Sequence, residues 1–202
     1  GVAYIGGKKF VKPLPNEIDD WSHFLQGPDN NPVANDSVVS TPRRLKWTCG
    51  PLWARSHEFL SSLAAMVSAE GRIFYVVDEG LPGTTDAPLP ERWMLTCRDA
   101  QNGVLLWKFP LEGWGAEAWG KRALRSTPQY VPASLVAGGG RLFIILDKSG
   151  PVSVLDAATG ELSRRSAARF ARSSLTRRAP AWRKTRPMSS RKRPTRLWME
   201  PA

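Results

Sequence analysis

The sequence has few of the residues that bind metal ions or act as nucleophiles. Its 202 residues include two histidines, His23 and His57, and two cysteines, Cys49 and Cys97. It contains no Cys-x-x-Cys pair, no second ligand at metal spacing from either histidine, and no Gly-x-Ser-x-Gly nucleophile elbow. The glycine run at 138–140 is not followed by Lys-Ser or Lys-Thr, which excludes a phosphate-binding loop there. We therefore expect no catalytic residue and no metal site, and the residues leave any cofactor-binding site unassigned.

Long apolar runs are also absent. No run approaches the ~18 apolar residues of a membrane-spanning helix, and no basic start followed by an apolar stretch marks a signal peptide. The chain begins at Gly1 rather than Met, so we expect a fragment or a processed product. The two cysteines allow one disulfide or two free thiols, and their spacing does not choose between these states.

The net charge of +11 comes from one end of the chain. Residues 163–202 hold 13 of the 29 Lys and Arg residues and a single acid, Glu200, which gives them a charge of +12. Residues 1–162 are close to neutral, at −1. The basic character, and any binding of polyanions that depends on it, therefore belongs to the tail.

From residue 45 onward the sequence has the texture of short β-strands separated by turns. The apolar runs are rich in Val, Ile, Phe, Tyr and Trp, and helical periodicity is mostly absent. Asn102-Gly103 is a strong hairpin signal, because a type I′ turn needs positive φ at both central residues. Residues 1–42, with their Pro, Gly and Asn clusters, are predicted to be a linker and lead-in segment. The predicted strands are 63–68, 72–77, 93–97, 104–109, 134–137, 141–146 and 152–155.

The same order of strands and turns occurs twice. Residues 71–78 (GRIFYVVD) match residues 140–147 (GRLFIILD), and residues 98–105 (RDAQNGVL) match residues 155–162 (LDAATGEL). Each copy therefore has four strands. The two copies are offset by 69 residues, where a four-stranded unit needs about 40–45, and two long loops account for the difference. Because a small sheet cannot bury both faces alone, we expect each copy to pack against neighbours; the alternative is a two-sheet sandwich with coincidental similarity.

The repeat resembles that of pyrroloquinoline-quinone (PQQ)-like β-propellers. In that family a Gly-led apolar strand and a hairpin are followed by Asp-Ala-x-Thr-Gly and, four residues after the glycine, by Trp. Residues 140–162 follow the pattern through Thr159-Gly160, and residues 99–107 follow it to Trp107. The lead-in at 20–31 (DWSHFLQGPDNN) resembles the segment that precedes the blades, and Arg44–Trp47 resembles a first strand. The resemblance covers residues 20–162 and is BamB-like in repeat type.

This resemblance implies an all-β fold, an incomplete β-propeller of about two four-stranded antiparallel blades at residues 43–162. Each Asp would accept hydrogen bonds from the backbone N–H groups of its turn. Each Gly would permit a left-handed backbone there, and the Trp would fill the space between neighbouring sheets. The turn residues to which it assigns such structural roles are Asp99, Gly103, Trp107, Asp156, Thr159 and Gly160.

The resemblance also implies a function in protein–protein interaction or scaffolding, without catalysis. Protein partners would bind the long loops at 79–92 and 110–132, and the location would be periplasmic or otherwise extracytoplasmic. The alternative is a fragment of a PQQ-dependent quinoprotein oxidoreductase. Such enzymes often carry adjacent cysteines and a calcium site, and neither is recognisable here. No cofactor is expected, because PQQ would sit on the central axis of a complete propeller, which has typically 4–8 blades.

The tail at 163–202 breaks the repeat. Arg164 stands where the next Trp is expected, so we expect the last blade strand to stop at Leu162 or Ser163. We favour translation out of frame from a GC-rich coding region, where Arg, Ala, Ser and Pro codons abound. The alternatives are a disordered or irregular segment and a basic arm that binds nucleic acid or another polyanion, with Trp182 and Trp198 stacking on bases.

Overall fold

The structure, a computed structural model, describes part of the chain. The described residues are 2–13, 15–39, 41–50, 62–83, 89–119, 127–128, 130–147 and 150–169, and for 116–117 and 166–169 the backbone only. The predicted tail beyond residue 169, His57 and parts of both long loops lie outside the described residues.

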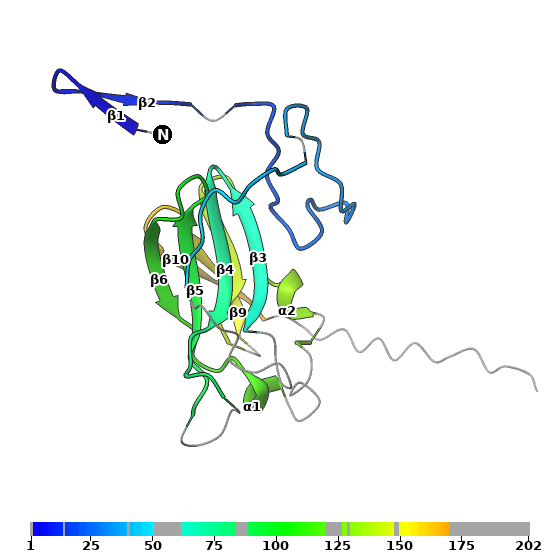
Figure 1. The fold of residues 1–202 in the computed structure, drawn as a ribbon. Helices are drawn as coiled ribbons and strands as arrows, with labels where there is room; N and C mark the ends of the chain where they lie inside the picture. Colours follow the sequence, from blue (N-terminus) through cyan, green and yellow to red (C-terminus); the bar gives the residue numbers. More distant parts are fainter. Residues whose placement is uncertain are drawn as a thin grey trace, which may run out of the picture. The chain divides into compact units, whose positions relative to one another are not determined.

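Eight strands form two antiparallel sheets of four strands each (Figure 1). The first sheet, blade 1, consists of β3 (Leu63–Ala69), β4 (Arg72–Asp78), β5 (Trp93–Asp99) and β6 (Leu105–Pro110). The second, blade 2, consists of β7 (Val136–Gly138), β8 (Arg141–Ile145), β9 (Pro151–Asp156) and β10 (Leu162–Arg169). In both sheets each strand pairs with the one before it in the chain. The prediction of an all-β fold with two four-stranded antiparallel blades is confirmed.

The remaining elements are short. β1 (Val2–Ile5) and β2 (Lys8–Val11) form a hairpin, within the segment predicted to be a linker, and all their residues are exposed. Gly6 and Gly7, both at positive φ, make its two-residue turn. Two single-turn helices, α1 (Ala116–Trp119) and α2 (Tyr130–Ala133), lie between the blades in the sequence. None of the helices in the described part of the chain is long and apolar enough to cross a membrane.

Two predicted strand positions need correction. The strand predicted at Arg44–Trp47 is not formed, since no residue of 41–50 belongs to a strand. β10 does not stop at Leu162 or Ser163 but continues to Arg169, with two register shifts against β9. The reason is that an edge strand is held by backbone hydrogen bonds, which do not depend on side-chain type. The described side chains of β10 are exposed, as expected for a sequence without an apolar face.

One hydrophobic core joins the two blades. Phe74 and Leu95 of blade 1 and Leu142, Ile144 and Leu155 of blade 2 are fully buried and belong to it. Because successive side chains of a strand point to opposite faces, these residues at even spacing share the face that meets the other sheet. Burying each such side chain contributes about 1.5–3 kcal/mol. This burial is the main favourable term holding the sheets together.

Replacing a residue of this core tests whether the two sheets depend on it. We expect Leu142→Ala to lower the free energy of unfolding by about 2–5 kcal/mol, because it leaves a cavity between the blades. Urea denaturation followed by circular dichroism measures the change. The matched control is Leu81→Ala, whose side chain is 67% exposed and whose loss should stay within about 0.5 kcal/mol. Equal losses for the two variants would show that the shared core does not stabilise the fold.

Candidate functional site

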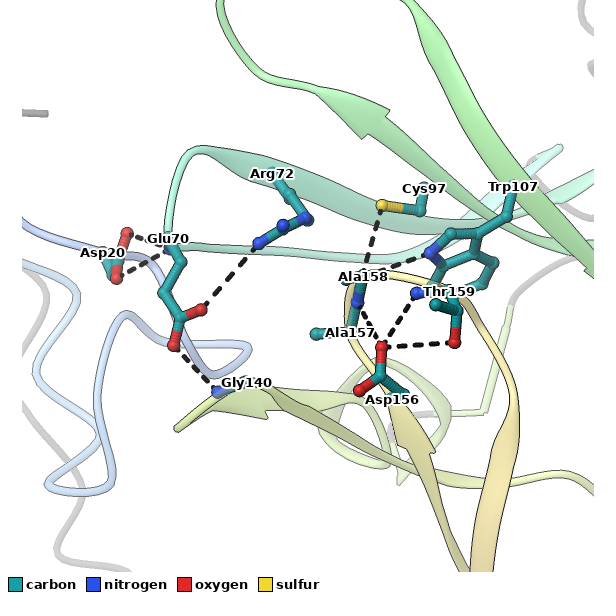
Figure 2. Close-up of polar contacts among 10 residues, drawn as sticks. All are labelled: Asp20, Glu70, Arg72, Cys97, Trp107, Gly140, Asp156, Ala157, Ala158 and Thr159. Carbon is teal, nitrogen blue, oxygen red and sulfur yellow. Dashed lines mark hydrogen bonds and ion pairs between the residues drawn. The ribbon is translucent and has the colours of Figure 1, made fainter. Parts of the chain in front are cut away.

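The turn between β9 and β10 is built around the side chain of Asp156. Its Oδ1 accepts hydrogen bonds from the backbone N–H groups of Ala158 (2.8 Å) and Thr159 (2.9 Å) and from Thr159 Oγ1 (3.2 Å) (Figure 2). The backbone bonds from Thr159 and Ala158 lower the pKa of Asp156, since they stabilise the carboxylate. Gly160, at φ 75°, donates its N–H to the Asp156 carbonyl at 2.9 Å and closes the turn.

The indole of Trp107, on β6 of blade 1, lies over this turn of blade 2. A Cβ on Gly160 would be 2.6 Å from Trp107 Cδ2, closer than two carbon atoms pack, so the ring reaches the turn only because glycine has no side chain. Trp107 Nε1 donates a hydrogen bond to the Ala157 carbonyl at 3.2 Å (Figure 2). The ring also contacts Phe74, at 6.0 Å between ring centroids. This arrangement is hereafter the tryptophan–turn contact.

Trp47 makes the same contact with blade 1. A Cβ on Gly103, at φ 73°, would lie 2.6 Å from Trp47 Cδ2, and Trp47 Nε1 donates to the Ala100 carbonyl at 3.0 Å. Asp99 Oδ1 accepts hydrogen bonds from the N–H groups two and three residues ahead, at 2.8 and 3.1 Å. Trp47 therefore contacts a turn of blade 1 in the same way that Trp107 of blade 1 contacts a turn of blade 2.

From the sequence, Trp47 is predicted only to lie in a first strand, and its contact with the turn of blade 1 is not predicted. A usable signal exists in the spacing. Trp47 precedes Gly103 by 56 residues, and Trp107 precedes Gly160 by 53. A search for tryptophans at similar distances before each turn glycine would have found the pair.

A second contact joins the blades at the turns of their first hairpins. Glu70, in the β3–β4 turn at φ 51°, accepts a hydrogen bond at Oε1 from the backbone N–H of Gly140, at 2.8 Å. Its Oε2 lies 3.8 Å from Arg72 Nη1. The backbone N–H of Glu70 donates to both carboxylate oxygens of Asp20, at 3.1 and 3.2 Å (Figure 2). Neither Glu70 nor Asp20 has a role predicted from the sequence.

The lead-in segment pairs with the first strand of both blades. Ser68, on β3, donates its N–H to the Trp21 carbonyl at 2.7 Å, and Ala137, on β7, donates to the Ser22 carbonyl at 3.0 Å. Trp21 N–H donates in turn to Ser68 Oγ at 3.1 Å. These bonds satisfy backbone groups on two edge strands that would otherwise be open to another chain.

The histidine and the two cysteines that the structure describes belong to no metal-binding cluster. No group of three or more His, Cys, Asp or Glu side chains among the described residues could hold a metal ion. His23 Nδ1 lies 2.8 Å from Ser22 Oγ. Both cysteines are free thiols: Cys49 is exposed, and Cys97 is fully buried. Burial raises the pKa of the Cys97 thiol to about 12, against a smaller opposing effect of Arg72.

No family model matches the chain, and no curated protein matches it. Among solved structures, a europium-containing methanol dehydrogenase is similar over 73% of this chain, at 14% sequence identity and a TM-score of 0.41. The chain spans 23% of the length of that structure.

The tryptophan–turn contact can be tested at its glycine. Gly160 and Gly139 both have positive φ, 75° and 58°, so alanine adds backbone strain of roughly 1 kcal/mol at either. A Cβ on Gly139 meets no atom within 4 Å, whereas one on Gly160 meets the indole. We expect Gly160→Ala to lower the free energy of unfolding by about 1–3 kcal/mol more than Gly139→Ala, measured in urea. In a Trp107→Ala background the difference should vanish; equal losses in the native background would contradict the contact.

The buried thiol predicts a dependence of stability on alkaline pH. A group whose pKa is raised on folding stabilises the folded state fully below its unfolded pKa, here about 9.0, and loses this contribution as pH rises toward the folded value of about 12. We expect the free energy of unfolding to fall more steeply above pH 9 in the native chain than in Cys97→Ala. Burial also raises the pKa of Tyr75, so only the difference between the two chains reports the thiol. Parallel pH profiles would show that Cys97 does not contribute.

Proposed function

We propose that the two sheets are consecutive blades of a PQQ-like β-propeller, BamB-like in repeat type, and that they act as a non-catalytic scaffold for protein–protein interaction. In this proposal the chain works outside the cytoplasm and needs no cofactor. Its contact surfaces are the long loops at 79–92 and 110–132 and the sheet surface that blade 2 leaves open.

The polar side chains of the repeat support a structural role. The carboxylates of Asp99 and Asp156 each bind the backbone of their own turn, and Glu70 connects one blade to the next. Groups engaged in this way hold the sheets in fixed positions, and rigid sheets with exposed loops suit a scaffold.

The observation that carries the proposal is an apolar row on the face of blade 2 that points away from blade 1. In blade 1 the neighbouring residues Phe74 and Cys97 lie on the face that meets blade 2 and are fully buried. Their repeat equivalents in blade 2 are Phe143 and Val154, paired in the same way, and both remain partly exposed. Because the equivalent apolar row is buried under protein in blade 1, the partly exposed row of blade 2 supports a protein-binding surface on this face.

A partner bound to this face of blade 2 would make different contacts from those by which blade 1 holds blade 2. Arg164 pairs with Val154, as Trp107 pairs with Cys97, so it occupies the position of the indole. Gly139 occupies the position of Glu70 in the hairpin turn. Blade 2 therefore has neither the indole nor the carboxylate with which blade 1 holds its neighbour. Apolar contact with the Phe143 row would supply most of the binding energy.

The proposal predicts that the 202-residue chain self-associates at micromolar concentration, because the open row of one molecule can cover that of another. We expect Phe143→Glu to shift the chain toward monomer, since burying a carboxylate without a partner is costly. Sedimentation velocity measures the distribution. Phe10→Glu is the matched control, with the same change at an exposed residue outside the row and outside both loops.

Val154→Glu provides a second test on the same row, and circular dichroism reports whether each variant is folded. Monomeric native chain, or association that neither row variant weakens, would refute an interaction surface at this face.

A further inference from the structure

The face of blade 2 that points away from blade 1 carries two arginines beside its apolar row. Arg141 lies on β8 on the same face as Phe143, because side chains two residues apart along a strand share a face. Arg164 lies on β10, where it pairs with Val154 of the row. Both arginines are exposed. Within the part of the chain that the structure describes, neither guanidinium forms an ion pair.

The acid nearest to these arginines in the sheet is already engaged. Asp156 is the partner of Arg141 in the β8–β9 pairing. Its carboxylate accepts hydrogen bonds from the backbone N–H groups of its own turn and forms no ion pair with Arg141. The face therefore combines an apolar row with two positive charges that no described carboxylate pairs with.

The contact between the two blades shows what such an arginine meets. Arg72 of blade 1 is the repeat equivalent of Arg141, since each directly follows the glycine of its hairpin turn. Arg72 shares the face of Phe74, which meets blade 2 (Figure 2). The pKa of Asp156 in blade 2 is lowered mainly by the N–H groups of its turn, and the charge of Arg72 lowers it further. A guanidinium of one sheet thus acts on a carboxylate of the next.

The second arginine also favours an acid in the partner. Trp107, at the equivalent position in blade 1, donates one N–H bond to a backbone carbonyl of blade 2. Arg164 instead presents several N–H groups in a planar fork, and this fork matches the two oxygens of a carboxylate. A single carbonyl would leave most of these donors without an acceptor.

We propose that the partner of this face is a protein segment in which carboxylates flank apolar residues. This inference rests on the proposed function, because it names the partner of the same face. The apolar residues would cover Phe143 and Val154, and the carboxylates would pair with Arg141 and Arg164. A second copy of this chain would bring arginines against arginines, so it is the weaker partner. Nucleic acid would pair its phosphates with the arginines and leave the apolar row uncovered.

The spacing of the two arginines determines the probe. Arg141 and Arg164 lie two strands apart, about 10 Å, and are offset by two residues, about 7 Å, which places their Cα atoms roughly 12 Å apart. In an extended peptide, residues i and i+4 are separated by roughly 13 Å and point to the same side. Acetyl-Glu-Thr-Leu-Thr-Glu-amide therefore presents two acids and an apolar residue to one surface. Acetyl-Gln-Thr-Leu-Thr-Gln-amide is the neutral control.

We expect the full 202-residue chain to bind the acidic peptide several-fold more tightly than the neutral one, because only the acidic peptide forms ion pairs. Added salt should weaken this binding, whereas it should strengthen self-association by screening the repulsion between arginines. Chemical-shift titration measures both peptides. Equal affinity for the two peptides would overturn the proposal.

Variants assign the binding to this face rather than to other basic residues of the chain. Arg141→Gln and Arg164→Gln should each weaken binding of the acidic peptide by roughly two- to fivefold, as expected for exposed ion pairs. Arg43→Gln, the same change at an exposed arginine outside the face, is the matched control and should leave the affinity unchanged. Equal affinity in all three variants would place the peptide elsewhere and refute the proposal.

Two further results separate this inference from its alternatives. An oligothymidylate that binds more tightly than the acidic peptide, and loses affinity in the same two arginine variants, would assign the face to nucleic acid and overturn the acidic partner. Self-association that depends on Phe143, without any preference for the acidic peptide, would refute the acidic partner and leave the scaffold function standing.

Discussion

The fold depends on an indole ring resting on a turn that has no side chain beneath the ring. The contact needs a glycine whose Cβ would otherwise collide with the ring, a carbonyl that accepts the indole N–H, and an aspartate that holds the turn in shape. Each requirement falls on a different residue of the Asp-Ala-Ala-Thr-Gly segment. The segment therefore forms a turn whose shape fits the indole. Burial of the large apolar ring stabilises the fold only when all three requirements are met.

The tryptophan–turn contact alone would leave the blades free to move about it. The opposite side of the interface is held by Glu70, which reaches Gly140 in the next blade, and by Asp20, which holds the turn of Glu70. The lead-in then pairs with β3 and β7 together. The angle between the sheets is thus set by contacts at separate places around the shared core, and the lead-in is a part of the fold rather than a linker to it.

The strands and turns could be predicted from the sequence because their signals are local. Runs of Val, Ile and Phe between glycines give each strand, and a repeated Asp and Gly at fixed spacing give each turn. Trp47 was misassigned because its contact partner is 56 residues away and its own segment has no strand. Glu70 resembles any exposed turn acid until Gly140 is placed beside it.

The tryptophan–turn contact also has a direction, because the indole belongs to one blade and the turn belongs to the next blade. Head-to-tail contacts of this kind grow into rings or open filaments. Among the described residues, the turn of blade 1 already contacts Trp47, and blade 2 has Arg164 at the position where blade 1 has its tryptophan. Among these residues neither blade can extend the contact to another molecule, so the two blades do not support head-to-tail growth through a tryptophan and a turn.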